Sequence, residues 1–462
     1  MGIFNFLELH TFLITCEILI LIVVVRMIVE KQKPTIMVAW LLAIVVIPYI
    51  AVPFYFIFGV RKRKGQRYKS IIYLKKINKI VNRTPHTICR VLMNRGIPEP
   101  TINNKLVLYT NGIKAFKALL QQINQANDSI YISSYVFKND NVTQELLERL
   151  AQKAKAGIKV KLLIDALGTY RVYFSQHIFK PLKDAGGKVC FFMPIIQMPF
   201  RNYINFRNHR KIFLFDGKVV LTGGMNLGDE YMGPEPYEKR WDDLLFLVQG
   251  DGLCHFHNIF ASDWAYAAKE KISEMLSVPS KHYGNNCLQV VPSGPDIPND
   301  ALYESLIAGI YTAKRRVWII TPYFIPSDSL MEALQIAYYR NVDVKLITPK
   351  VSNHLIADLA RSHYIRQLQS VGIDIVLFDK KMIHAKAMLF DDEAVMLGSV
   401  NLDNRSLFLN YEIVTFAYDK VVVREIYQWM SEFLIDATTS LPVANRYRKL
   451  GENMVKFLVP LL

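Results

Sequence analysis

The feature that most constrains this 462-residue chain is a His-x-Lys-x-x-x-x-Asp pattern that occurs twice. In both copies an asparagine follows the histidine at a distance of 17 residues. Equal spacing through the whole pattern is hard to produce by chance, and it indicates an internal duplication in which each half supplies the same polar groups. The members are, in order, His209, Lys211, Asp216 and Asn226 in the first copy, and His384, Lys386, Asp391 and Asn401 in the second.

The residues around both copies predict an α/β fold that is repeated. Short apolar runs rich in β-branched residues alternate with stretches of helical periodicity, which is typical of buried strands joined by crossover helices. We expect two pseudo-symmetric αβ repeats packed as one body. The predicted strand, helix and strand are 131–137, 143–156 and 159–165 in the first repeat, and 317–324, 328–340 and 342–348 in the second.

Each His-x-Lys pair is expected on one face of a strand that opens a β-hairpin. The sequence KIFLF is followed by a turn at Asp216-Gly217 and by KVVLTGG, and AKAMLF, Asp391-Asp392-Glu393 and AVMLGS repeat this order. Side chains two residues apart leave the same face of a strand, so each copy presents an imidazole, an ammonium and an amide together. Two copies that face each other would suit a phosphodiester. One neutral histidine attacks phosphorus, the other protonates the leaving oxygen, and lysines and asparagines hold the remaining oxygens.

Longer segments around these motifs resemble the phospholipase D superfamily and, within it, the bacterial cardiolipin synthases. The matching segments are NFRNHRKIFLFDG (205–217), GGMNLGDEY (223–231) and IHAKAMLFDDEAVMLGSVNLDNRSLFLNYE (383–412). The resemblance covers essentially the whole chain. It implies a transfer of a phosphatidyl group between two phosphatidylglycerol molecules through a phosphohistidine, without metal or cofactor. It also implies that His209 is the nucleophile and His384 the general acid and base, and the reverse assignment stays open.

The resemblance extends to residues beyond the histidines and lysines. Ser399 joins the two motif asparagines as an expected phosphate ligand. Asp243 and Glu412 stand where the superfamily has acids that orient a catalytic histidine. Which acid serves which histidine stays open.

Four further residues carry different expectations. The motif aspartates Asp216 and Asp391 fall at hairpin turns, which favours a structural role over a chemical one. Tyr135 and Tyr323 occupy matching places in the two repeats. They could line the site, but packing in the core is the more common use of such residues.

Two long apolar runs near the N-terminus predict a transmembrane hairpin. Residues 11–25 contain one charged residue and residues 36–58 contain none. A run of the second length spans a hydrocarbon core of about 30 Å. Basic residues gather at 61–69, so we expect that cluster, the N-terminus and the body to be cytoplasmic in a multi-pass protein of the cell membrane.

The net charge of +16 is concentrated outside the predicted catalytic body. Residues 61–100 carry +11 and residues 441–462 carry +3, whereas residues 101–440 carry only +2. This distribution favours phosphatidylglycerol and other anionic membrane lipids as partners, and it argues against nucleic acid. The expected units are a transmembrane hairpin (1–60), a basic juxtamembrane linker (61–100), two repeats (101–280 and 281–440) and an amphipathic C-terminal tail (441–462).

Several alternatives remain open from sequence. The tail could lie on lipid or pack on the body. Within the same fold, the acceptor could be water, which would make the protein a hydrolase. A nuclease and a non-catalytic membrane scaffold are weaker alternatives, because the membrane segments argue against the first and the intact double motif against the second.

Overall fold

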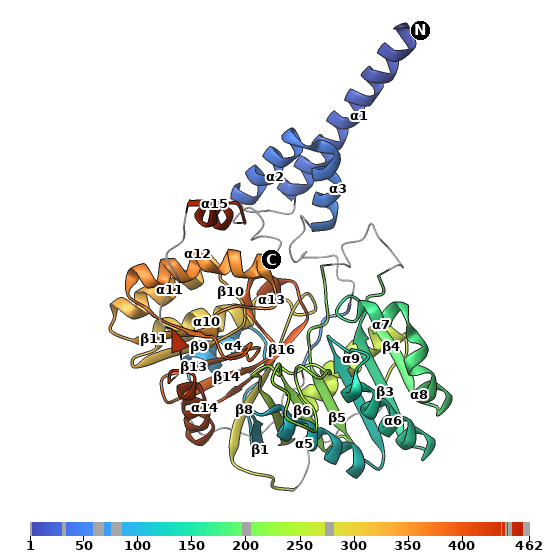
Figure 1. Cartoon of the computed structure of the whole chain (residues 1–462), viewed down its shortest axis with the longest axis vertical. Helices are drawn as coiled ribbons and strands as arrows, with labels where there is room; N and C mark the ends of the chain where they lie inside the picture. Colours follow the sequence, from blue (N-terminus) through green and yellow to red (C-terminus); the bar gives the residue numbers. More distant parts are fainter. Residues whose placement is uncertain are drawn as a thin grey trace.

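The body of the protein is built on one mixed β-sheet to which both halves of the sequence contribute (Figure 1). The computed structural model describes residues 2–29, 34–58, 69–74, 86–195, 205–272, 281–435, 437–438, 441 and 446–455. The first half supplies β1 (Thr101–Tyr109), β2 (Ser129–Ser134), β3 (Lys159–Asp165), β4 (Lys188–Phe192), β5 (Ile212–Phe215), β6 (Val219–Gly223) and β7 (Leu245–Gly250). The second half supplies β8 (Asn286–Ser293), β9 (Arg316–Ile320), β11 (Asp343–Pro349), β12 (Asp374–Phe378), β13 (Ala387–Phe390), β14 (Ala394–Gly398), β16 (Glu412–Ala417) and β17 (Ala437–Thr438).

The two halves repeat one strand order on either side of the sheet's centre. From the centre outwards the first half runs β1-β7-β6-β5-β2-β3-β4, and the second runs β8-β16-β14-β13-β9-β11-β12. β2, β3 and β4 are parallel, as are β9, β11 and β12, whereas β5–β6 and β13–β14 form antiparallel hairpins. Ile132 pairs with Phe213 in the first half, and Ile319 pairs with Met388 in the second. The predicted α/β body with two repeats is therefore confirmed.

Helices cover both faces of this sheet. On one face, α9 (Leu253–Ala268) and α14 (Lys420–Glu432) bury apolar side chains in a core that spans both repeats. Each repeat has its own core on the opposite face. That face carries α5 (Gly112–Gln125), α6 (Asn141–Lys155) and α8 (Lys180–Asp184) in the first repeat, and α4 (Thr87–Asn94), α10 (Ala301–Thr312), α11 (Asp328–Tyr339) and α12 (Leu355–Val371) in the second. Shorter elements are α7 (Tyr170–Phe174), a 3₁₀ turn (Gln176–Phe179), α13 (Asn404–Phe408), and the strand pair β10 (Phe324–Ile325) and β15 (Leu402–Asp403).

The motif aspartates tie each hairpin turn to the neighbouring parallel strand. The Asp216 carboxylate accepts the backbone N–H groups of residues 127–129 at 2.8–3.1 Å, where β2 begins. Asp391 accepts those of residues 314–316 at 2.7–3.1 Å, where β9 begins. Both aspartates have a positive φ, +51° and +52°, a conformation that Asp tolerates better than most side chains.

Three helices precede the body: α1 (Gly2–Val29), α2 (Pro34–Val46) and α3 (Pro48–Phe58). The prediction of a single helix over 36–58 is wrong, because the helix is interrupted at Ile47, between α2 and α3. Pro48 has no N–H group, and it disfavours helical geometry in the residue before it. Among the described residues, no helix is both long enough and apolar enough to cross a membrane. The three helices pack on one another through Val23, Met27, Ile44, Ala51 and Tyr55.

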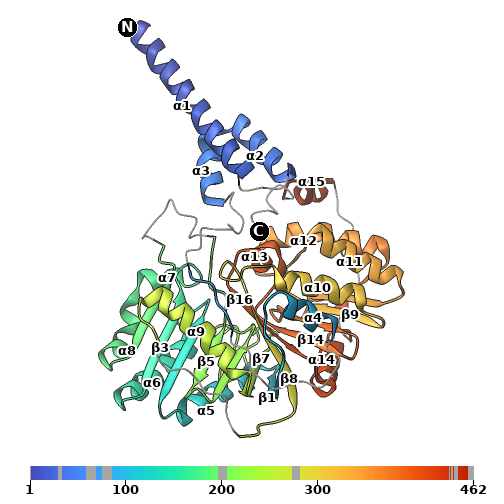
Figure 2. The same ribbon diagram turned by 180° about the vertical axis from the view of Figure 1, so that it is seen from behind.

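The C-terminal helix and the residue Lys69, which follows the N-terminal helices, both pack on the body. α1–α3 project from the end of the body that carries α7, α12 and α13 (Figure 1, Figure 2). α15 (Arg446–Val455) packs on α12, where the buried Glu452 lies 3.2 Å from Arg366. Of the two alternatives for the tail, packing on the body therefore describes residues 446–455. Lys69, which we assigned to a lipid-contacting basic cluster, is instead buried, and residues 61–68 of that cluster lie outside the described residues.

Candidate active site

Backbone pairing with the opposite repeat holds each motif histidine. The His209 N–H donates to the carbonyl of Tyr411 at 2.8 Å, and the His384 N–H donates to the carbonyl of Asp242 at 2.7 Å. Both histidines therefore lie just before a strand and not within it as predicted, since β5 begins at Ile212. In each case the residue that accepts this bond belongs to the other half of the chain and is followed directly by a carboxylate residue, Glu412 or Asp243. The backbone pairing therefore brings each histidine close to a carboxylate that is distant in sequence.

Each motif histidine is paired with a carboxylate from the opposite repeat. Glu412 of the second repeat lies with Oε2 3.0 Å from Nδ1 of His209, and Asp243 of the first repeat lies with Oδ2 2.6 Å from Nδ1 of His384. Lys386 Nζ is also 2.9 Å from that second Nδ1, but a carboxylate can only accept, so we assign the Nδ1 proton to the bond with Asp243. In both imidazoles, Nε2 is then the nitrogen available to a substrate.

Ser399 supports one of these carboxylates and does not line the cavity. Its hydroxyl donates to Glu412 Oε2 at 2.5 Å and accepts the Ile413 N–H at 3.1 Å. The expectation that Ser399 binds phosphate therefore has no support from its position. At the equivalent place the first repeat has Gly224, where a Cβ atom would lie 2.2 Å from Asp243 Oδ1.

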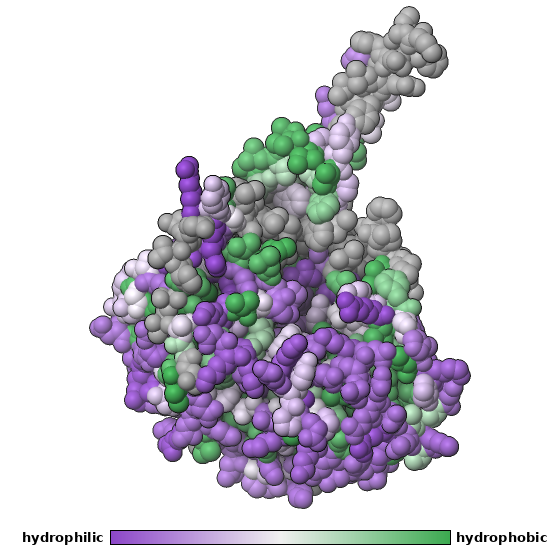
Figure 3. All heavy atoms as spheres, in the orientation of Figure 1, coloured by the Kyte–Doolittle hydropathy of each residue, from purple (hydrophilic) through white to green (hydrophobic). Residues whose placement is uncertain are grey.

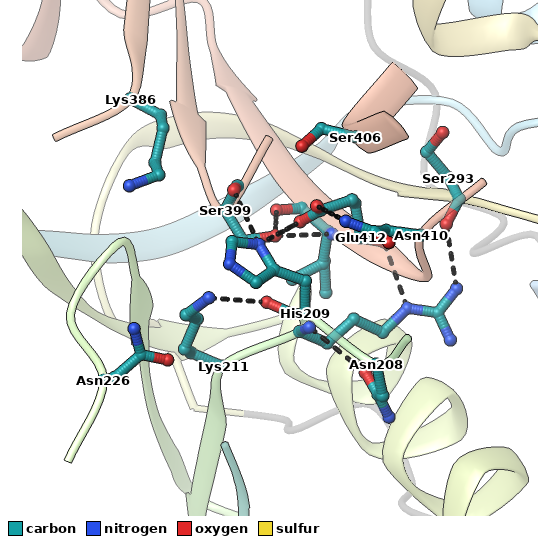
Figure 4. Close-up of polar contacts among 12 residues, drawn as sticks. Asn208, His209, Lys211, Asn226, Ser293, Lys386, Ser399, Ser406, Asn410 and Glu412 are labelled. Carbon is teal, nitrogen blue, oxygen red and sulfur yellow. Dashed lines mark hydrogen bonds and ion pairs between the residues drawn. The ribbon is translucent and has the colours of Figure 1, made fainter. Parts of the chain in front are cut away.

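Both motif lysines are buried beside the histidines. Lys211 Nζ donates to the His209 carbonyl at 2.9 Å, and Lys386 Nζ donates to the His384 carbonyl. Figure 4 shows Lys211 and Lys386 on the side of the His209 ring that faces away from Glu412. Burial lowers the pKa of Lys211 to about 7 and that of Lys386 to about 8, so both ammonium groups are poised to respond to a bound anion.

Burial also keeps both imidazoles neutral. It lowers the pKa of His209, although Glu412 opposes this effect. Burial, together with the charge of Lys386, lowers the pKa of His384 to about 3, against the pull of Asp243. A neutral imidazole is the form that can act as a nucleophile.

The two histidines line one cavity of about 920 Å³, and Asn226 and Asn401 line it with them. The Asn226 carbonyl oxygen accepts the Val136 N–H at 3.2 Å, which leaves its NH₂ group for other partners. The structure thus brings together the two histidines and the two asparagines around one space. Asp216 and Asp391 are remote from it, at the hairpin turns.

Aromatic rings complete the cavity wall, and sequence reasoning undervalued them. Tyr135 and Tyr323 both line the cavity, and Tyr323 also packs against a buried apolar cluster that contains Ile325 and Ala360. The Tyr135 ring stands edge-on to His209, with 4.8 Å between ring centroids. The ring centroids of Tyr231 and Trp241 lie 5.1 and 5.4 Å from that of His384, and these two residues were not identified as part of the site from the sequence. Their closeness to the motifs, in GDEY and KRWDD, was the only signal in the sequence.

Comparisons with known proteins agree with this geometry. The sequence model of the family described as "Cardiolipin synthase, PLD-like domain" matches residues 119–264 and 306–434. The chain is 31% identical to the major cardiolipin synthase of Bacillus subtilis over 90% of both chains, and 30% identical to a cardiolipin synthase of Geobacillus kaustophilus, with 93% and 88% of the two chains covered. The crystal structure of a phosphatidylserine synthase from Haemophilus influenzae shares the fold, with a TM-score of 0.61, 16% identity, and 81% and 98% of the two chains covered. The chain therefore belongs to the cardiolipin synthase family of phospholipase-D-like proteins.

Proposed function

We propose that this protein is a cardiolipin synthase that transfers a phosphatidyl group from one phosphatidylglycerol to another, releasing glycerol. One observation carries the proposal: two imidazoles, each hydrogen-bonded to a buried carboxylate of the opposite repeat, line a single cavity. Two such pairs at one space supply a nucleophile and a separate acid and base, which a two-step transfer needs. Membership in the cardiolipin synthase family supports the same reaction.

In the first step, His209 Nε2 attacks the phosphorus of the donor lipid. The bond between phosphorus and the headgroup glycerol oxygen breaks as the phosphorus–nitrogen bond forms. Protonated His384 gives its proton to the departing glycerol oxygen. The phosphate's negative charge raises the pKa of His384 above its value in the empty site, because a nearby anion favours the imidazolium.

In the second step, neutral His384 removes the proton from a hydroxyl of the second phosphatidylglycerol. That oxygen attacks phosphorus, the bond to His209 breaks, and His384 is left protonated for the next cycle. Lys211 and Lys386 stabilise the charge on the non-bridging oxygens, and Asn226 and Asn401 donate hydrogen bonds to them. Asp216 and Asp391 take no chemical part in this proposal.

A product assay tests the overall reaction. Purified full-length protein in detergent is given phosphatidylglycerol alone, and the products are separated and quantified. Cardiolipin and free glycerol in equal amounts are expected. Phosphatidic acid as the main product would make water the acceptor and would replace the synthase by the hydrolase alternative.

A trapping experiment tests the assignment of the nucleophile. Phosphatidylglycerol labelled in the phosphatidyl group is mixed with enzyme, the reaction is quenched in base, and protein-bound label is counted. His384→Ala is expected to retain some label, whereas His209→Ala is expected to retain none. Label on the His209→Ala protein and none on the His384→Ala protein would reverse the two roles.

We further propose that α1–α3 hold the chain at the cell membrane, with the body in the cytoplasm. Apolar side chains stay exposed along α1, α2 and the start of α3, which suits contact with lipid. The body also presents apolar groups at its near end: Leu355 and Ile356 line the cavity and are exposed, and Phe174 is exposed on α7. Figure 3 shows apolar patches at this end, beneath the three helices. A cavity mouth of this kind would admit a headgroup while the acyl chains stay in the bilayer.

A further inference from the structure

Lys69 is buried although it continues the basic cluster that follows the apolar helices. Its ammonium lies 2.5 Å from Asp263 Oδ1 and 2.6 Å from Asp296 Oδ2, with a side-chain exposure of 1%. A lysine charge at this depth is costly unless it is paired, and here two carboxylates receive it. The backbone also fixes the segment, because the Ile72 N–H donates to the Asp296 carbonyl at 3.1 Å.

The same two carboxylates hold Arg210, the residue between the motif His209 and Lys211. Its guanidinium donates to Asp263 Oδ1 at 2.8 Å and to both oxygens of Asp296 at 2.9 Å. Two cations therefore balance two anions in a buried cluster. Because the charges match, removal of Lys69 alone would leave one negative charge without compensation.

This cluster also holds the side chains of the two residues that flank His209, Asn208 and Arg210. Arg210 Nε donates to the Glu412 carbonyl at 3.0 Å, and Asn208 Nδ2 donates to Asp263 Oδ2 at 3.1 Å. Glu412 is the residue whose carboxylate meets His209 Nδ1. A shift of Asp263 or Arg210 would thus move the imidazole and its carboxylate relative to each other.

The second repeat is built differently at this place. The residue between His384 and Lys386 is Ala385, which is buried in the apolar core. Within the described residues, the ionic cluster therefore stands behind His209 and not behind His384.

We infer that Lys69 is a positioning residue: it anchors the linker from the N-terminal helices in a two-carboxylate site and thereby sets the geometry of the His209–Glu412 pair. The inference rests on the proposed function, because His209 acts there as the nucleophile. It assigns to Lys69 a role different from lipid contact. A lipid-contacting lysine would affect vesicle binding, whereas a positioning lysine affects the rate at which the phosphatidyl-enzyme forms.

The test uses full-length Lys69→Met, with Lys180→Met as the matched control. Lys180 is an exposed lysine whose partner, Asp184, lies 2.7 Å away on the surface of α8. With phosphatidylglycerol vesicles, we expect Lys69→Met to form the phosphatidyl-enzyme about 10- to 100-fold more slowly, as small displacements of reacting groups do, with KM and the vesicle-bound fraction unchanged. Lys180→Met is expected to match the wild type in all three.

Two further measurements keep the inference falsifiable if Lys69→Met folds poorly. The double variant Lys69→Met/Asp296→Asn restores charge balance and should recover part of the lost rate. In the wild type, an amine-reactive reagent should label Lys180 much faster than Lys69. Equal labelling of the two lysines, or a Lys69→Met protein with a normal rate but weaker vesicle binding, would overturn the inference. Absence of cardiolipin formation by the wild type would instead refute the proposed function.

Discussion

At the scale of single residues, Ser399 and Gly224 occupy equivalent positions and serve their carboxylates in opposite ways. Ser399 donates to Glu412, whereas Gly224 leaves room for Asp243. We expect Ser399→Ala to fold normally and to lose about tenfold in kcat, near the lower end of the effect of one charge-assisted hydrogen bond (about 1.5–3 kcal/mol), because Asn410 still donates to Glu412 Oε1. Gly224→Ala should lose far more, since its Cβ would displace Asp243 from His384. Steady-state rates of both variants check this, and equal losses would contradict it.

The two motif lysines lead to a prediction about protons. Their pKa values of about 7 and about 8 in the empty site mean that, at about pH 8, Lys211 is mostly neutral and Lys386 is about half charged. A bound phosphodiester anion favours the charged forms, so binding should take up protons at this pH. Calorimetry of short-chain phosphatidylglycerol binding in two buffers of different ionisation enthalpy measures the uptake. Lys211→Arg, which stays charged, should take up less, and proton release by the wild type would contradict the prediction.

At the scale of elements, we expect the motif aspartates to stabilise the hairpin turns and to take no part in the chemistry. Burial alone would raise the pKa of Asp216, but three backbone N–H groups outweigh it and lower the pKa below its usual value of 3.8. The carboxylate therefore contributes stability above that value, and this contribution is lost as the pH falls through the lowered pKa. We expect Asp216→Asn to lower the free energy of unfolding by about 1–2 kcal/mol at neutral pH and to leave kcat unchanged. The difference from the wild type should become smaller at acidic pH.

Thermal and denaturant unfolding measure this effect, with Asp184→Asn as the control. Asp184 is an exposed aspartate on α8 that makes a surface ion pair, so its replacement should cost little at any pH. If Asp216→Asn loses kcat but keeps its stability, then Asp216 has a chemical role and the structural interpretation is wrong.

Elements and motifs could be predicted from this sequence where the signal is local. The hairpins at Asp216 and Asp391 follow from short apolar runs around turn residues, and both are present. Contacts between distant residues could not be predicted. Glu412 meets His209 across 203 residues, and Lys69 meets Asp296 across 227. Local periodicity contains no information about contacts between residues this far apart in sequence. The pairing of each acid with its histidine, and the burial of one lysine of a basic run, could therefore be seen only in the folded structure.

At the scale of the whole molecule, the duplication explains why neither repeat would suffice alone. The carboxylate of each histidine comes from the other repeat, as does the backbone carbonyl that holds it. The strands β1 and β8 join the halves into one continuous sheet, so the two histidines keep a fixed relation. The cavity opens at the end of the body where α7, α12 and the N-terminal helices gather, which orients the site toward the proposed membrane face.

That orientation can be tested with two valines of equal exposure. Val351 lies in the loop before α12 that also carries the cavity-lining Asn353, and Val421 lies on α14, at the far end of the body in Figure 1; both valines are 72% exposed. An aspartate at the membrane face would meet anionic headgroups and lose apolar contact, so Val351→Asp should lower vesicle binding and the rate on vesicle substrate. Val421→Asp should change neither. On short-chain phosphatidylglycerol dissolved below its aggregation limit, both variants should match the wild type, because no bilayer has to be entered. Equal behaviour of the two variants on vesicles would place the membrane against a different face of the body.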